Sequence, residues 1–273
     1  MVGMKKVLTI AGSDCSGGAG VQADLKTMTA HGVYGMSAFA MLTAQNTTGI
    51  QEVFDLPPAF LATQIDSCCT DIMPDATKTG ALFDAEKIKV TADKIKQYNL
   101  KNVVIDPVMV CTANGGVTDC LLKPEAVAIM IDELFSVADI ITPNIPETVV
   151  LVEKITGKSV QIDSREKMEE CAKILAETVK NQCVLVKGGH FSECSDCLYF
   201  DGKITWFEGK KVDTKNTHGT GCTLSSAIAS NLALGFDMVE SVKNAKDYVY
   251  NAILNDPKIG HGNGPVNHCW NIK

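Results

Sequence analysis

The sequence lacks the long apolar and long basic segments that mark two large classes of protein. No stretch of its 273 residues approaches the roughly 20 apolar residues that a membrane-spanning helix needs. Its 25 basic residues form no long run and are outnumbered by 32 acidic ones, which gives a net charge of −7. An acidic chain without a basic run disfavours nucleic acid as a partner. We therefore expect neither a membrane nor a nucleic acid among its partners.

The first residues also lack the pattern of a secretory signal. The apolar run at 7–11 is too short for a signal-peptide core, and no cleavage site of the usual kind follows it. Cysteine, by contrast, is frequent, with 11 residues. Without a sign of export, these cysteines are expected to be reduced thiols in a cytoplasmic protein.

Short β-branched runs alternate with segments of helical spacing along the chain. The expected strands are 5–11, 35–42, 75–79, 102–107, 140–143 and 183–187, and the expected helices are 21–31, 58–70, 84–97, 124–134, 147–155, 164–180, 223–234 and 238–254. Residues 197–206 and 210–213 predict a hairpin that turns at Asp201-Gly202. This alternation predicts an α/β fold with a mostly parallel sheet covered on both faces. No repeat or low-complexity linker interrupts it, so we expect a single domain over 1–273.

Five clusters of glycine, acid, amide or lysine residues follow directly after predicted strands. They lie at 11–24, 106–116, 142–147, 186–190 and 213–225. Ligands of a parallel α/β sheet bind outside the carboxyl ends of its strands, so these clusters are the candidates for a site. In the first cluster, Ala23 breaks the dinucleotide fingerprint, and no Gly-Lys-Ser/Thr follows to make a P-loop. A plain strand-to-helix turn is the alternative there.

The last cluster points most directly to chemistry. Gly219 and Gly221 permit a tight turn whose N–H groups converge at a helix start, which makes an anion-binding nest. Phosphoryl transfer depends on such positioning and charge stabilisation. Cys222 falls in the first helical turn, where the pKa of a thiol is lowered toward thiolate. We expect Cys222 to accept a proton from a substrate hydroxyl; a capping turn with an inert buried cysteine is the alternative.

The other clusters contain acids, an amide and a lysine, which are side chains that could bind a metal ion or phosphates. Asp106, at a strand end, could hold Mg²⁺, or it could be a turn acid. Asn144 and Glu147 could face a hydrated metal, although a capping box is the simpler interpretation of that pair alone. Lys187 could contact a phosphate, with a surface lysine as the alternative. The glycine-bearing stretch 112–117 predicts a loop that folds over substrate.

The order and spacing of these segments resemble the ribokinase-like superfamily, and more narrowly the bacterial hydroxymethylpyrimidine/phosphomethylpyrimidine kinases of thiamin biosynthesis. The matching text is TIAGSDCSGGAGVQADLKT from Thr9, TAQNT from Thr43, KTG from Lys78, DPVM from Asp106, TPNIPE from Thr142, VKGGH from Val186, NTHGTGCTLSSAIA from Asn216 and GHGNGPVNH from Gly260. It covers nearly the whole chain, and the last three segments are highly specific together. The resemblance implies a three-layer α/β/α fold, ATP as phosphate donor, Mg²⁺ as cofactor and a homodimer.

The resemblance also implies a role for each candidate residue. Gly219, Thr220 and Gly221 would form the anion hole, with Cys222 as base, and Lys187 and Asn144 would lie at the ATP phosphates. Gln45 would hydrogen-bond the pyrimidine, Gly12 and Val108 would orient it through their backbone, and Asp24 would line the same pocket. Asp106 and Glu147 would hold Mg²⁺ together with Asn144. Sugar kinases of the superfamily carry aspartate at the position of Cys222, so the cysteine favours a vitamin precursor as acceptor.

Cys111 leaves the identity of that precursor open. Many hydroxymethylpyrimidine kinases have alanine there, and a cysteine in this lid is similar to the pyridoxal kinases of the same branch, whose lid thiol can add to the aldehyde. The expected reaction is phosphorylation of 4-amino-5-hydroxymethyl-2-methylpyrimidine by ATP, followed by phosphorylation of its monophosphate. Pyridoxal or pyridoxine kinase is the alternative, and a non-catalytic vitamer-binding protein is a rival of another class. The glycine spacing disfavours a nicotinamide oxidoreductase.

Overall fold

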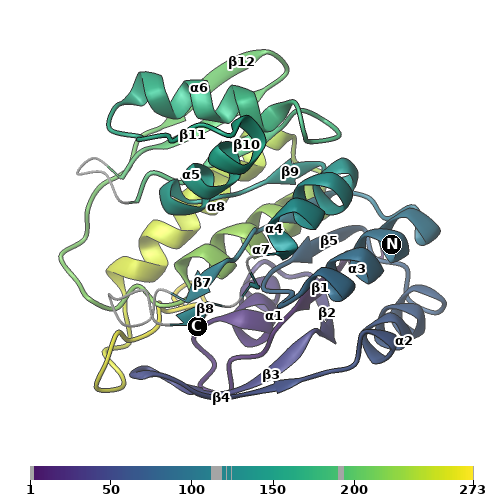
Figure 1. Cartoon of the computed structure of the whole chain (residues 1–273). Coiled ribbons are helices and arrows are strands. Elements are labelled where there is room, and N and C mark those ends of the chain that lie inside the picture. Colours follow the sequence, from purple (N-terminus) through teal and green to yellow (C-terminus); the bar gives the residue numbers. More distant parts are fainter. Residues whose placement is uncertain (1–2, 112–118, 121, 124, 190–193, 273) are drawn as a thin grey trace.

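An eight-stranded sheet runs through the centre of the described part of the molecule (Figure 1). The structure is a computed structural model that describes residues 3–111, 119–120, 122–123, 125–189 and 194–272. In spatial order the strands are β12 (Lys203–Phe207), β11 (Asp196–Phe200), β10 (Val184–Val186), β9 (Ile140–Ile141), β6 (Val103–Ile105), β5 (Ala76–Thr79), β1 (Lys6–Ala11) and β2 (Tyr34–Phe39). The strands from β10 to β2 are parallel, whereas β11 and β12 pair antiparallel. The prediction of a mostly parallel sheet is confirmed.

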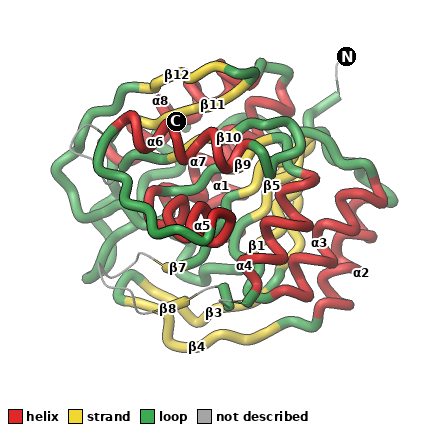
Figure 2. Tube along the Cα trace, turned by 45° about the horizontal axis from the view of Figure 1, so that its top comes forward, coloured by secondary structure: helices red, strands yellow, loops and turns green. Residues whose placement is uncertain are grey.

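Helices cover both faces of this sheet. They are α1 (Gly20–Ala30), α2 (Pro58–Cys69), α3 (Ala85–Tyr98), α4 (Ala126–Ile129), α5 (Ile145–Thr156), α6 (Arg165–Ala176), α7 (Thr220–Leu234) and α8 (Met238–Leu254). Successive strand residues point to opposite faces. Ile10 and Ile105 accordingly pack in a core with α2 to α6, while Val7 and Val104 pack in a second core with α1, α7 and α8. The expected three-layer α/β/α architecture is confirmed (Figure 2).

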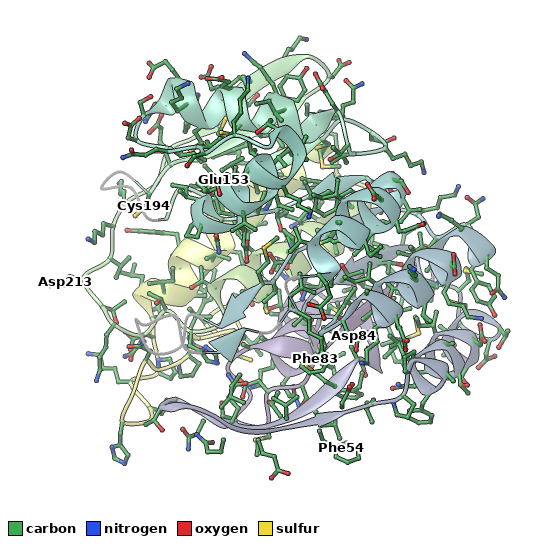
Figure 3. All side chains as sticks on the ribbon, in the orientation of Figure 1. Phe54, Phe83, Asp84, Glu153, Cys194 and Asp213 are labelled. Atoms are coloured by element: carbon green, nitrogen blue, oxygen red, sulfur yellow. The ribbon has the colours of Figure 1, made fainter. Side chains whose placement is uncertain are left out.

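A small antiparallel hairpin leaves the main sheet and flanks its carboxyl edge. The run predicted as one strand at 35–42 divides at Ala40 into β2 and β3 (Met41–Asn46), and β3 pairs with β4 (Gly49–Asp55). Residues of β3 alternate between buried and exposed, so one face of the hairpin turns inward. The other face is exposed and includes Phe54, which projects at the outer edge in Figure 3. β4 was not predicted, because most of its residues are exposed and carry no buried apolar pattern.

The observed elements differ from those predicted from the sequence in three further places. The hairpin of β11 and β12 turns at Asp201-Gly202 as predicted, but 210–213 forms no strand. The helix predicted at 124–134 is a short α4 followed by a π turn at Met130–Leu134 and a 3₁₀ turn at Phe135–Val137. A two-residue ladder joins β7 (Val110–Cys111) to β8 (Asp119–Cys120). No helix of the described residues is long and apolar enough to cross a membrane.

Candidate active site

A cavity of about 500 Å³ opens at the carboxyl ends of the parallel strands. Its centre is the turn at 219–222 that begins α7. One end is lined by the loop after β1 and by β3, including Gly12 and Gln45, and the other end by the segment 209–214 and by α8, including Ile253. A hollow of this size with polar groups near its centre is typical of a ligand site. Segments from both halves of the chain therefore build one cavity.

The turn before α7 is shaped to leave backbone N–H groups free. Gly219 has φ 83°, and a Cβ on it would lie 1.8 Å from the Gly18 carbonyl oxygen, so only glycine fits. Thr220 Oγ1 donates to the Thr217 carbonyl oxygen at 2.6 Å and braces the turn. Among the described hydrogen bonds, none uses the N–H groups of Gly221 and Cys222. Unpaired N–H groups at a helix N-terminus can bind an anion, so this geometry suits the anion-binding nest expected from the sequence.

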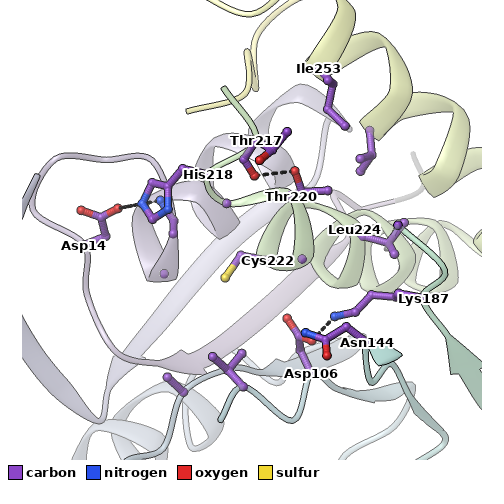
Figure 4. A pocket seen from close by; sticks show the side chains of 18 of the residues that line it. Asp14, Asp106, Asn144, Lys187, Thr217, His218, Thr220, Cys222, Leu224 and Ile253 are labelled. Atoms are coloured by element: carbon purple, nitrogen blue, oxygen red, sulfur yellow. Dashed lines mark hydrogen bonds and ion pairs between the residues drawn. The ribbon is translucent and has the colours of Figure 1, made fainter. Parts of the chain in front are cut away.

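Cys222 lies in this first helical turn, half-buried, with its sulfur facing the cavity between the Asp14–His218 pair and the Asp106–Lys187 pair (Figure 4). Burial raises the pKa of the Cys222 thiol to about 11, although Lys78 and a backbone N–H partly oppose this rise. The expectation of a lowered pKa is therefore wrong. Loss of solvation outweighs the helix N-terminus. The position suits a proton acceptor, but the raised pKa leaves only a small fraction of thiolate at pH 7.

Lys187 and Asp106 form an ion pair against the same turn. Lys187 Nζ lies 2.7 Å from Asp106 Oδ1, and both side chains are largely buried. A Cβ built on Gly221 would lie 3.4 Å from both Lys187 Nζ and Asp106 Oδ2, so the pair touches the anion site. Burial would lower the pKa of Lys187, but the charges of Asp106 and Glu147 raise it above its ordinary value. Lys187 is thus a buried cation at the cavity and not a surface lysine.

Asn144 and Glu147 form the capping box of α5 and also line the cavity. Asn144 Oδ1 accepts from the Glu147 N–H at 2.9 Å, and Glu147 Oε2 accepts from the Asn144 N–H at 2.8 Å. Burial and the nearby Asp106 charge raise the pKa of Glu147 to about 7, despite Lys187. The two carboxylates are oxygen donors of the kind Mg²⁺ prefers. A divalent cation would offset their mutual repulsion, so Asp106 and Glu147 fit the expected metal.

Gln45, Gly12 and Val108 all line the cavity. Thr43 Oγ1 lies 3.2 Å from Gln45 Oε1 and helps to hold that side chain. The N–H groups of Gly12 and Val108 already donate within the protein, to the carbonyl oxygens of Ala81 and Asp106. These two residues therefore shape the pocket without offering an N–H to a ligand.

Asp24 and Cys111 differ from the expectation. Asp24 is fully buried beneath the cavity and does not line it; Lys78, Thr9 and Ser226 all donate to its carboxylate. The prediction that Asp24 lines the acceptor pocket is wrong, because its carboxylate oxygens accept hydrogen bonds from these three internal partners. Cys111 pairs with Asp119 through its backbone, but its side chain and the expected lid at 112–117 lie outside the described residues.

The sequence interpretation missed the pairing of Asp14 with His218. His218 Nε2 lies 2.8 Å from Asp14 Oδ2 and donates to it, since a carboxylate only accepts. Burial raises the pKa of Asp14, but hydrogen bonds from His218 and Ser16 lower it below its ordinary value. The pair joins the loop after β1 to the turn before α7. Both residues stand in the matched motifs, yet 204 positions separate them, so no local pattern indicated the contact.

Comparison with known proteins places these segments in a family. Residues 14–267 match the family described as phosphomethylpyrimidine kinase. The chain is 45% identical over 264 residues to the thiamine biosynthesis bifunctional protein ThiED of Geobacter sulfurreducens, covering 96% of this chain and 52% of that protein. It is 42% identical over 266 residues to the hydroxymethylpyrimidine/phosphomethylpyrimidine kinase of Rhizobium meliloti, covering 96% of each. The chain thus spans about half the length of the first relative and nearly all of the second.

Solved structures agree on the fold. The ADP complex of Bacillus subtilis pyridoxal kinase has a TM-score of 0.87 at 34% identity and covers 98% of each chain. The phosphomethylpyrimidine kinase of Clostridium difficile 630 has a TM-score of 0.77 at 40% identity, with 91% of this chain and 99% of that chain covered. The family match extends from Asp14 in the first loop to beyond the turn at 219–222, and thus over the segments that line the cavity. On that match, the chain belongs to the phosphomethylpyrimidine kinase family.

Proposed function

We propose that this chain transfers the γ-phosphoryl group of ATP to the hydroxymethyl group of 4-amino-5-hydroxymethyl-2-methylpyrimidine, and then phosphorylates the resulting monophosphate. The observation that carries the proposal is the position of the turn at 219–222. It lies between the cation Lys187 on one side and the Asp14–His218 pair on the other (Figure 4), where Gln45 Nε2 lies 3.4 Å from His218 Nε2. The name of the R. meliloti relative supports the same acceptor, and that of the G. sulfurreducens relative supports a place in thiamine biosynthesis.

The arrangement divides the reaction between three parts of the site. The free N–H groups of Gly221 and Cys222 stabilise the charge of the transferring phosphoryl group. Lys187 contacts the same phosphates as a point charge. The acceptor oxygen bonds to the γ-phosphorus while the bond to the bridging oxygen breaks and ADP leaves with that electron pair. The hydroxyl proton passes to the thiolate form of Cys222. When bound at Asp106 and Glu147, Mg²⁺ supplies neutralising charge for the phosphates.

ATP is supported as the donor by the shape of the other end of the cavity. There the segment 209–214 and α8 provide apolar contacts from Val212, Val249 and Ile253, with Lys210 and Lys211 beside them. Pyridoxal kinases of similar fold were solved with ADP and with AMP-PCP. This end of the cavity therefore suits a nucleotide whose planar base packs against the apolar side chains and whose phosphates point toward the lysines.

A coupled assay of ADP release tests the proposal. The purified chain is given ATP and Mg²⁺ with each of four acceptors: the hydroxymethylpyrimidine, its monophosphate, pyridoxal and pyridoxine. We expect the highest kcat/KM with the first two. Tight vitamer binding with no ADP release from any acceptor would contradict the proposal and favour a binding protein.

Pyridoxal is the second candidate acceptor, because a specific observation favours it. The pyridoxal kinase of B. subtilis superposes with a higher TM-score, 0.87 against 0.77, than the phosphomethylpyrimidine kinase of C. difficile. Cys111 adds to this case through its similarity to pyridoxal kinases. A kcat/KM for pyridoxal above that for the pyrimidine would make this the main activity.

We also propose that a second copy of the chain covers the outer face of the hairpin of β3 and β4. Leu42 and Phe54 pair across these adjacent strands and are exposed on this face, and Phe54 keeps 62% of its surface. An exposed apolar patch of this kind is typical of an interface. Light scattering should give twice the mass of the chain, and Phe54→Glu should halve it. A wild-type monomer at micromolar concentration would contradict the dimer.

A further inference from the structure

A buried ion pair lies directly beneath the active-site turn and has no role in the mechanism above. Lys78 on β5 and Asp24 on α1 are both fully buried, and Lys78 Nζ lies 2.9 Å from both carboxylate oxygens. Thr9 and Ser226 each donate to the same carboxylate at 2.6 Å. Lysine is almost never fully buried unless it is paired, and removing even a paired lysine and carboxylate from water opposes folding. The pair therefore calls for a functional explanation.

The geometry brings this pair close to Cys222. Ser226 follows Cys222 by four residues on α7, so both side chains lie on the same helix face, and Ser226 Oγ donates to Asp24. The Lys78 ammonium reaches the carboxyl end of β5. A Cβ built on Gly80, just after this strand, would lie 2.9 Å from Lys78 Nζ and 3.0 Å from the Ala11 side chain. Ala11 lines the cavity. The cation thus lies just under the cavity floor, beside the first turn of α7.

Four charged groups face the Cys222 thiol from the surrounding elements. Lys78 acts on it from β5, Asp24 from α1, Asp106 from the end of β6 and Lys187 from the end of β10. Of the two members of the buried pair, Lys78 has the larger effect, and it favours the thiolate. The described hydrogen bonds of Lys78 both go to Asp24, so its action on the sulfur is electrostatic.

We propose that Lys78 is a positioning residue of the transfer step: held by Asp24, its ammonium is a fixed positive charge beneath Cys222 that supports the thiolate. The proposal rests on the role of Cys222 in the proposed function. When the acceptor hydroxyl attacks phosphorus, its proton passes to the Cys222 sulfur, and the thiol later returns that proton to solvent. A cation fixed under the sulfur stabilises the thiolate before transfer without occupying space in the cavity.

Alkylation of Cys222 tests this without reference to catalysis. The full chain is treated with iodoacetamide at pH 9, and the modified peptides are quantified by mass spectrometry. The exposed Cys269 is the internal reference. Lys78→Met should slow the alkylation of Cys222 about tenfold, because only the thiolate reacts and one pKa unit changes its population tenfold. Asp24→Asn should instead speed it by a similar factor, since it removes a negative charge and leaves the cation.

Lys87→Met is the matched control. Lys87 is also a fully buried lysine paired with carboxylates, those of Asp55 and Asp84, and it does not line the cavity. This variant should leave the alkylation of Cys222 and the kcat unchanged. Lys78→Met should lower kcat about tenfold while the KM for ATP stays within about twofold. Thermal unfolding of each variant reports whether it is folded.

The outcomes separate this inference from the proposed function. If the wild type phosphorylates no acceptor, the proposed function fails, but the alkylation rates still report the action of Lys78 on Cys222. If the wild type is active and Lys78→Met alkylates Cys222 at the wild-type rate, the inference is wrong. If Lys78→Met does not fold, Asp24→Asn decides: faster alkylation supports the inference, and an unchanged or slower rate overturns it.

Discussion

At the scale of single residues, burial and neighbouring charge act against each other. The Cys222 thiol lies at a helix N-terminus with a cation beneath it, and both favour the thiolate. Loss of water nevertheless dominates and keeps the pKa at about 11. Burial also dominates at Glu147, where it raises the pKa of the carboxyl to about 7 although the charge of Lys187 opposes this rise. Burial thus favours the uncharged form of both groups.

His268 gives a residue-scale prediction for stability. Burial, with the charges of Lys26 and His218, lowers its pKa from 6.5 to about 4, and its Nε2 has no partner among the described residues. The unfolded chain binds this proton near pH 6.5 and the folded chain only near pH 4, so stability falls as the pH drops through that window. Protonation of His268 in the unfolded chain should lower the free energy of unfolding by about 2 kcal/mol between pH 7 and pH 5.

Urea unfolding at pH 7 and pH 5 measures this loss. His268→Leu should make the loss between the two pH values smaller by about 2 kcal/mol. The exposed His261 provides the control, since His261→Gln should keep the wild-type loss. Equal losses in wild type and His268→Leu would show that His268 does not titrate as the structure indicates.

At the scale of elements, the two ends of α7 offer a matched comparison. Gly219 and Gly235 both have positive φ, 83° and 97°. A Cβ at Gly219 would lie 1.8 Å from the Gly18 carbonyl oxygen, whereas a Cβ at Gly235 meets no atom within 4 Å. Gly219→Ala should therefore displace the free N–H groups and reduce kcat about 100-fold. Gly235→Ala should cost about 1 kcal/mol of stability and leave kcat unchanged.

Steady-state kinetics of both alanine variants, with thermal unfolding beside them, checks this contrast. The comparison separates damage to the anion site from backbone strain in general. A Gly219→Ala enzyme with a kcat within a few-fold of wild type would mean that the turn does not stabilise the transferring group.

Elements with a strong local pattern could be predicted from sequence, and the contacts between them could not. The apolar runs of β1, β6 and β10 predicted strands because their residues are buried on both faces. β4 has no such pattern, because one face of its hairpin meets solvent. The glycine turn at 219–222 was predicted because its chemistry is local. Asp24 was misplaced because its partner Lys78 lies 54 residues away.

At the scale of the whole molecule, the fold joins the two ends of the sequence into one site. The loop after β1 and the turn before α7 meet through Asp14 and His218, and α1 packs beside α7 in one core. The ion pair of Lys187 and Asp106 comes from the middle of the chain. Loops of a doubly covered parallel sheet converge in this way at the carboxyl ends of the strands. Segments from both ends and from the middle of the chain thus line one cavity.

The central claim is that phosphoryl transfer occurs at the turn before α7, with Cys222 as proton acceptor. The most direct test measures kcat with the hydroxymethylpyrimidine, together with the dissociation constant for ATP, in wild type, in Cys222→Ala and in the control Cys269→Ala. We expect Cys222→Ala to lower kcat about 100-fold while ATP binding stays within about twofold, and Cys269→Ala to change neither. A Cys222→Ala enzyme that keeps its kcat within a few-fold of wild type would contradict the claim.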